Sequence, residues 1–199
     1  ALVKLEKKLN SELKINNTKK FIYEISCLAS YKSLSTFNWS NFVLDLPEIS
    51  DLVKQQIINP KKEEQIIKKL KYKDIKNSIS LKVKKQYEKS PYPKWVKIAL
   101  KNKPDKPINF FKNLNLNIHD EIIKDWNDIN VLVAGCGTGQ HAITTASKYE
   151  NAFVTAIDLS ANSLSYAKRK ADELKIENIE FVQIDILDLK NYRKEFNII

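Results

Sequence analysis

The fold of this chain is decided by the stretch Val131-Leu132-Val133-Ala134-Gly135-Cys136-Gly137-Thr138-Gly139. Its first four residues are apolar and predict a buried strand, and the alternating glycines that follow predict a tight turn. These are the only three glycines among 199 residues. Backbone without a Cβ lets a ligand approach closely, and a helix after the turn would offer free N–H groups and the positive end of its dipole. The loop is therefore a candidate ligand-binding loop.

The spacing of the glycines separates this loop from two well-known phosphate-binding loops. A nicotinamide-binding loop reads G-x-G-x-x-G, whereas this one reads G-x-G-x-G, with Gln140 where the third glycine would fall. A Walker loop would end in Gly-Lys-Ser or Gly-Lys-Thr, which the sequence lacks. Since such a loop can also be a purely structural turn, the segments that follow have to decide between the two.

Helices and strands alternate after the loop. The apolar spacing predicts helices over residues 140–149 and 160–174, with Ser160 as a helix cap. Strands are expected over 152–159 and 179–184, and a further strand is expected to begin at 195–199. The pattern predicts an α/β fold of the Rossmann-like, doubly wound type, with a parallel sheet and a ligand at the carboxyl edge of its strands.

Two acids lie where these strands end. Asp158 follows Gly139 by 19 residues, close to the roughly 20 expected of an acid that meets a ribose in such a unit. A carboxylate suits this task because it can accept hydrogen bonds from both ribose hydroxyls. Asp185 ends the next strand in the same way. Each acid alone could be an ordinary strand-end residue, but the order and spacing of loop, acid and acid favour a binding site.

In its motifs the segment 129–199 resembles the class I methyltransferases that depend on S-adenosylmethionine (SAM). The resemblance implies that the glycine loop lines the methionine and ribose of SAM, that Asp158 binds the ribose hydroxyls, and that Asp185 and the backbone N–H of Ile186 meet the adenine. The residues that it implies as cofactor-binding are Gly135, Cys136, Gly137, Thr138, Gly139, Gln140, Asp158, Leu159, Asp185 and Ile186. Val133 is a departure, because many relatives carry an acid at that position.

An aromatic and proline-rich segment precedes the glycine loop. Residues 83–95 read VKKQYEKSPYPKW, in which Pro91 and Pro93 favour an extended path. Tyr87, Tyr92 and Trp95 place three rings around it. One interpretation is a staple that ties a leading helix to the domain. The other is a lid that closes over the cofactor, which would add these three residues to the cofactor site.

The motifs Q-Y-E-x-x-P-Y-P-x-W, A-G-C-G-T-G-Q-H and A-I-D-L-S-x-x-S-L-x-Y-A-K-R-K make the resemblance more specific. Over residues 79–199 they resemble bacterial methyltransferases that follow tetratricopeptide-type helical repeats. Residues 1–78 show no clean repeat period. We therefore expect three parts: a helical extension over 1–78, a leading helix with the proline segment and a linker over 79–128, and the first half of the SAM-binding domain over 129–199.

Apolar spacing predicts irregular helices in the first two parts, at about residues 1–15, 19–35, 49–58, 61–71, 79–89 and 117–127, with a linker at 102–107. One apolar stripe combines Leu2, Leu5, Leu9 and Leu13. Such stripes are typical of core packing, although the helical region could also hold a protein partner.

Charge is distributed unevenly along the chain. The net charge is +10, with −1 on residues 129–199 and +11 on residues 1–128. Because 32 of the 34 basic residues are lysines and only Arg169 and Arg193 are arginines, the charge favours solvated helix faces over a nucleic-acid groove. The composition gives no indication of a membrane span, a signal peptide or a metal site, and two cysteines, Cys27 and Cys136, fit a reducing cytoplasm.

The chain is expected to be a fragment, since it has no methionine and stops inside the expected fourth strand. The methyl acceptor is then unidentified and could be a small molecule or a protein. No catalytic base is assigned, and His141 and His119 are poor candidates for one. The fragment alone is expected to be inactive. Two alternatives stay open beside methyl transfer. A polyamine synthase would transfer an aminopropyl group on the same fold, and a non-catalytic protein would bind SAM or serve as a helical scaffold. A nicotinamide enzyme is a distant third.

Overall fold

The computed structural model describes residues 1–89, 91–101, 103–112, 121, 126–192 and 194–199. The chain divides into two compact units, Ala1–Glu64 and Gln65–Ile199. The division therefore lies before the expected boundary at residue 78, because residues 65–78 pack with the second unit. The expected helix over 117–127 and His119 fall almost entirely outside the described residues. Among the residues described, no helix has the length and apolar character needed to span a membrane.

The first unit is built from short helical segments rather than long helices. Its α-helices are α1 (Leu2–Glu12), α2 (Ile22–Ala29), α3 (Ser50–Val53) and the start of α4 (Asn59–Ile67). Short 3₁₀ segments lie between them, η1 (Thr18–Phe21), η2 (Leu34–Thr36), η3 (Ser40–Val43) and η4 (Pro47–Ile49), and a π-helical turn, η5 (Lys54–Ile58), joins α3 to α4. The long helices expected at 1–15 and 19–35 are thus shorter and interrupted.

A core of its own holds the first unit together. Leu9 and Leu13 are buried and Leu2 and Leu5 pack against them, so the expected apolar stripe of α1 is core. Trp39 stacks on Phe37, and its Nε1–H donates to Asn10 Oδ1 (2.8 Å).

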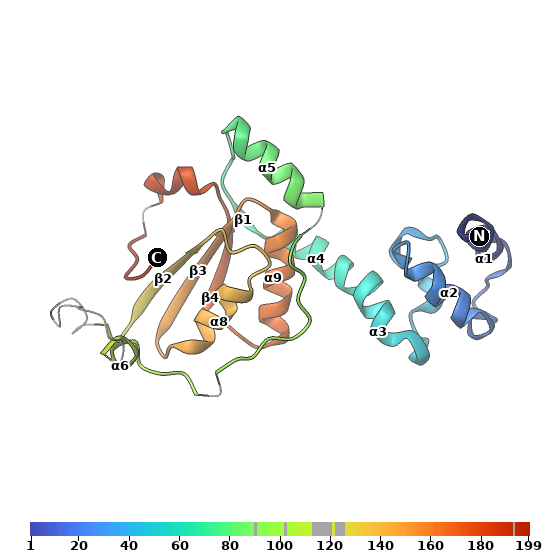
Figure 1. The fold of residues 1–199 in the computed structure, drawn as a ribbon, viewed down its shortest axis with the longest axis horizontal. Helices are drawn as coiled ribbons and strands as arrows, with labels where there is room; N and C mark the ends of the chain where they lie inside the picture. The colour runs from blue at the N-terminus through green and yellow to red at the C-terminus, as the bar shows by residue number, and fades with distance from the viewer. Residues whose placement is uncertain (90, 102, 113–120, 122–125, 193) are drawn as a thin grey trace. The chain divides into compact units, whose positions relative to one another are not determined.

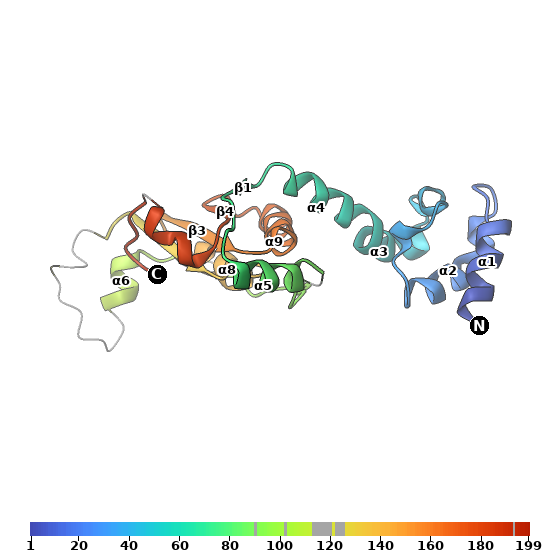
Figure 2. The ribbon, with the colours of Figure 1, turned by 90° about the horizontal axis from the view of Figure 1, so that it is seen from above.

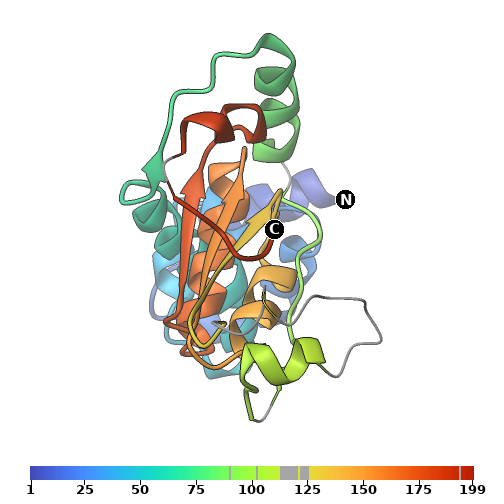
Figure 3. The same ribbon diagram turned by 90° about the vertical axis from the view of Figure 1, so that its left-hand side faces the viewer.

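The second unit contains one sheet and the helices around it (Figures 1 and 3). Its elements are β1 (Lys71–Tyr72), α5 (Ser78–Lys89), α6 (Pro107–Lys112), β2 (Ile129–Ala134), α8 (Gln140–Lys148), β3 (Ala152–Asp158), α9 (Ala161–Glu173), β4 (Ile179–Gln183) and η6 (Ile186–Asn191). From β2 onward these elements confirm the expected alternation. α5 and η6 both lie at the end of the sheet where the strands terminate, and Figure 2 views this end from above.

The sheet is parallel, in the order β1-β4-β3-β2. β2 and β3 pair from Ile129 with Ala152 to Ala134 with Ile157, so these two strands end side by side. The glycine loop after β2 and Asp158 at the end of β3 consequently meet at the carboxyl edge of the sheet, where a Rossmann-like fold binds its ligand.

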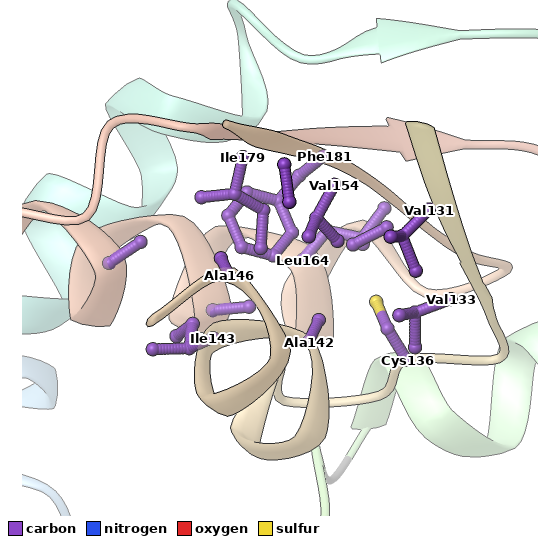
Figure 4. Close-up of a cluster of buried hydrophobic side chains, with 14 of the residues drawn as sticks. Val131, Val133, Cys136, Ala142, Ile143, Ala146, Val154, Leu164, Ile179 and Phe181 are labelled. Atoms are coloured by element: carbon purple, nitrogen blue, oxygen red, sulfur yellow. The ribbon is translucent and has the colours of Figure 1, made fainter. Parts of the chain in front are cut away.

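Strand side chains alternate between two apolar layers. Val131, Val133, Val154 and Phe181 face α8 and α9, where Ile143 and Leu164 complete the larger core (Figure 4). The alternate residues, Leu132, Ile157 and Val182, form a smaller cluster with Ile184 on the other side of the sheet. Burial on both sides explains why these strands read as nearly continuous apolar runs.

Two expectations about the second unit need correction. Residues 61–71 are not one helix: α4 ends at Ile67, and Lys71–Tyr72 form β1. The strand expected to begin at 195–199 agrees with a single parallel bridge from Ile198 to Val131 of β2. The linker expected at 102–107 is anchored, because Asp105 bridges to Tyr149 at the end of α8.

Candidate functional site

The three glycines of the loop all adopt positive φ angles, Gly135 at +70°, Gly137 at +53° and Gly139 at +81°. L-residues with a Cβ adopt this region only with strain, which explains why the turn uses glycine at each alternate position. A Cβ on Gly135 would meet nothing within 4 Å, so its α-carbon faces open space. A Cβ on Gly137 would have only the carbonyl oxygen of Tyr92 nearby, at 3.9 Å.

Gly139 has a different task from the other two glycines. A Cβ there would lie 2.5 Å from Ala167 Cβ and 3.2 Å from Ala167 Cα on α9. The residue thus permits close approach of the start of α8 to α9, and it does not line the cavity. Gly139 is thus a packing position in this structure, and its expected contact with a cofactor stays a prediction.

Asp158 fixes the two segments between which it lies. Its Oδ2 accepts from the backbone N–H of Gly137 (2.9 Å), and its Oδ1 accepts from the backbone N–H of Ser160 (2.8 Å). The carboxylate is only partly buried and lines the cavity. Each carboxylate oxygen can accept more than one hydrogen bond, so Asp158 can hold the loop and still accept from a ligand hydroxyl.

A cavity of about 630 Å³ lies above the glycine loop, within the range typical of small-molecule sites. The expected residues that line it are Tyr87, Tyr92, Gly135, Cys136, Gly137, Thr138, Gln140, Asp158, Leu159 and Ile186. Val83, Pro93, His141, Ile157, Ser163 and Ile184 line it as well. Val83 and Pro93 belong to the segment 83–95 that was interpreted as a lid or a staple, and alternation along β3 could have indicated Ile157. Nothing local to Ser163 signals a site.

Asp185 lies beside the cavity rather than in its lining. It is the N-cap of η6, where its Oδ1 accepts from the N–H of Leu187 (3.0 Å). Its Oδ2 is buried and, among the residues that the structure describes, has no hydrogen-bond partner. A buried acceptor without a donor is costly, so this oxygen points to a donor that the described residues do not supply. Ile186, next in the chain, is exposed and lines the cavity.

The proline segment is fastened to the glycine loop through Thr138. The Thr138 hydroxyl donates to the carbonyl of Pro93, and Trp95 Nε1–H donates to the carbonyl of Thr138 (3.0 Å). Trp95 is buried, its ring meets Tyr166 edge to face, and Tyr166 donates its hydroxyl hydrogen to the Trp95 carbonyl. The peptide bond between Tyr92 and Pro93 is cis.

The three aromatic residues of this segment therefore divide between the two interpretations. Trp95 is part of the core and does not line the cavity, which favours the staple for this residue. Tyr87 and Tyr92 line the cavity and keep 45% and 75% of their surface exposed.

Cys136 has its thiol in the core although its backbone belongs to the loop. Burial, with a smaller effect from the nearby charge of Asp158, raises the pKa of the Cys136 thiol well above its ordinary value. The thiol stays neutral at physiological pH and is a poor nucleophile, which agrees with a small loop residue and not a catalytic one.

Comparisons with known proteins bear on this part of the chain. Residues 126–199 match the family model described as a methyltransferase domain. A tRNA (guanine-N(7)-)-methyltransferase of Clostridium novyi (strain NT) is 33% identical over 93 residues, which are 46% of this chain and 42% of that protein. A methyltransferase of Geobacillus sp. (strain WCH70) is 39% identical over 62 residues, 31% of this chain and 24% of that protein. The chain thus spans less than half the length of either relative.

A solved SAM-dependent methyltransferase from Aquifex aeolicus is 28% identical over 29% of this chain and 31% of that one, with a TM-score of 0.27. A TM-score this low does not show a shared fold. The similarity to methyltransferases therefore rests on the sequence matches.

Proposed function

We propose that the protein is a class I methyltransferase that transfers a methyl group from SAM to an acceptor. Residues 126–199 match the model of a methyltransferase domain, and a relative that is 33% identical over 93 residues is a methyltransferase. The observation that carries the proposal is the meeting of three features at one sheet edge. These are an open glycine turn at Gly135 and Gly137, the carboxylate of Asp158 hydrogen-bonded to that turn, and a cavity above both.

The residues present fit SAM. The missing Cβ of Gly135 leaves room against the backbone, and Asp158 offers acceptor oxygens for ribose hydroxyls. The buried Oδ2 of Asp185, which has no hydrogen-bond partner in the described part of the chain, offers an acceptor for an amino group such as that of adenine. When bound, SAM supplies an activated methyl group on a sulfonium sulfur. The chain's part in the reaction is to hold and orient it, since proximity and orientation account for much of such catalysis.

We propose that the acceptor is a small molecule or a protein. One relative is named as a tRNA methyltransferase, but the basic charge of this chain lies outside residues 129–199 and is almost wholly lysine, which does not favour a nucleic-acid groove. The same proposal has three further parts. The protein is related to tetratricopeptide-associated methyltransferases, it binds a protein partner through its helical region, and it acts in the cytoplasm.

Transfer of labelled methyl groups from SAM tests the proposal. The protein is incubated with labelled SAM and separated pools of small molecules, proteins and RNA, beside an Asp158→Ala variant. We expect label in the small-molecule or protein pool with the parent protein and not with the variant. Label found only in RNA would contradict the proposed acceptor, and label in no pool would contradict methyl transfer itself.

A further inference from the structure

Glu88, near the end of α5, joins that helix to the start of α9. Its Oε1 accepts from the backbone N–H of Ala161 (2.9 Å), and its Oε2 accepts from that of Asn162 (3.4 Å). In return, Asn162 Nδ2–H donates to the backbone carbonyl of Glu88 (2.6 Å). The two residues thus bind each other through side chain and backbone, although 74 positions separate them.

The contact completes the capping of α9. The first amides of a helix have no partner within it. Here the Oγ of Ser160 accepts from the N–H of Ser163 (3.1 Å), and ordinary helical bonding begins with the N–H of Leu164 and the Ser160 carbonyl (3.0 Å). Glu88 takes the N–H groups of Ala161 and Asn162 that remain. A carboxylate stabilises the N-terminus of a helix and destabilises a C-terminus. Glu88 therefore occupies an unfavourable position in its own helix and a favourable one for α9.

This capped end of α9 lies beside the carboxylate of Asp158, which is expected to bind the ribose of SAM. Asp158 accepts from the N–H of Ser160, the residue directly before α9, and from the N–H of Gly137 in the loop. Hydrogen bonds therefore link Glu88 to Ala161 at the start of α9, the adjacent Ser160 to Asp158, and Asp158 to the glycine turn.

The helix that carries Glu88 also forms one wall of the cavity. Val83 and Tyr87 of α5 both line it, and Tyr87 is adjacent to Glu88 in the chain. Removal of the Glu88 carboxylate would break its two hydrogen bonds to α9 beside Tyr87 in the chain, and would leave the bond from Asn162 to the Glu88 carbonyl.

We propose that Glu88 is a positioning residue that couples the docking of α5 to the binding of SAM. The inference rests on the proposed function, since it takes the cavity to be the cofactor site. Because coupling between two equilibria is reciprocal, a ligand that contacts Tyr87 and Asp158 stabilises the docked helix, and the docked helix strengthens ligand binding.

The experiment measures the dissociation constant of S-adenosylhomocysteine, the demethylated product, by calorimetry, and hydrogen exchange over residues 78–89 with and without that ligand. In the parent protein the ligand should slow exchange in α5. Glu88→Ala should weaken binding by about 5-fold to 30-fold and remove most of the slowing. Glu88→Gln should lie between the two, because its one carbonyl oxygen can still accept from Ala161.

The matched control is Glu173→Ala. Glu173 lies at the other end of α9 from Ala161, and its carboxylate pairs with Arg169 Nη1 (2.8 Å). This variant should lower the melting temperature and leave the dissociation constant unchanged. Equal weakening of binding by both variants would overturn the inference in favour of general destabilisation.

Failure of the inference and failure of the proposed function are separable. A parent protein that does not bind S-adenosylhomocysteine contradicts the proposed function. If the parent binds it, and the Glu88 variants bind it equally well with the same slowing of exchange in α5, the coupling is disproved while the function stands. Should Glu88→Ala fail to fold, Glu88→Gln carries the same comparison.

Discussion

The two ends of the glycine loop use the same residue type for opposite purposes. At Gly135 the absent side chain leaves space toward the cavity, whereas at Gly139 it leaves space for Ala167 of α9. Both glycines have positive φ angles, and a sequence motif cannot distinguish them. The difference teaches that one motif can combine a ligand contact with a helix contact, so each position needs its own test.

The largest effect on stability is expected from Gly139→Ala. The new methyl group would lie 2.5 Å from Ala167 Cβ, and its φ of +81° adds backbone strain. We expect a loss of about 2–5 kcal/mol in the free energy of unfolding, measured with denaturant. Gly135→Ala is the control, with about 1–2 kcal/mol from backbone strain alone. Equal losses at the two positions would break the distinction between them.

The largest effect on binding is expected from Asp158→Ala. It removes acceptors for ligand hydroxyls and the bond that fixes Gly137, so affinity for S-adenosylhomocysteine should fall by about 2–4 kcal/mol, or roughly 30-fold to 1000-fold. Asp158→Asn should cost less, because one acceptor oxygen survives. Asp172→Ala, an exposed acid of α9 paired with Lys168, should leave calorimetric affinity unchanged. A folded Asp158→Ala protein with unaltered affinity would show that the acid is structural.

The proline segment offers the same contrast between core and cavity. Trp95→Phe loses the bond to the Thr138 carbonyl and should cost about 1–2 kcal/mol of unfolding free energy with little change in ligand affinity. Tyr92→Ala changes an exposed residue of the cavity and should do the reverse. Chemical denaturation and calorimetry on the two variants measure both effects. If Trp95→Phe weakened ligand binding and left the free energy of unfolding unchanged, the result would favour the lid over the staple.

The smallest expected effect is on the chemical reactivity of Cys136, which lies between Gly135 and Gly137 in the loop. Because burial raises the pKa of its thiol, the group stays protonated at a pH where an exposed thiol ionises. Iodoacetamide at pH 8.5 should therefore modify exposed Cys27 and spare Cys136 until the protein is unfolded, as mass spectrometry of the peptides would show. Equal modification rates in the folded protein would place the thiol in solvent.

Prediction from the sequence succeeded where a local pattern determines the structure. The strands and helices from β2 to β4 follow from apolar runs and helical spacing, and Ser160 caps α9 as expected. It failed where tertiary contacts decide. Lys71–Tyr72 carry no strand pattern and become β1 through pairing with β4. In the first unit the helices expected at 1–15 and 19–35 are shortened to α1 and α2, and 3₁₀ segments lie beside them.

The candidate site divides in the same way. Gly135, Gly137 and Asp158 were identified because spacing along the chain determines their meeting at one sheet edge. The core position of Trp95 and the contact of Glu88 with Ala161 depend on how α5 and the proline segment fold back on α9. No local spacing encodes such contacts, since the partners are separated by 43 and 73 residues.

The central claim is that this cavity holds SAM, and calorimetric titration of the protein with S-adenosylhomocysteine and, separately, with NAD tests it most directly. We expect saturable binding of S-adenosylhomocysteine with one site per chain, and no heat of binding from NAD, because the third glycine of a nicotinamide loop is Gln140 here. Tight binding of NAD with no response to S-adenosylhomocysteine would contradict the assignment.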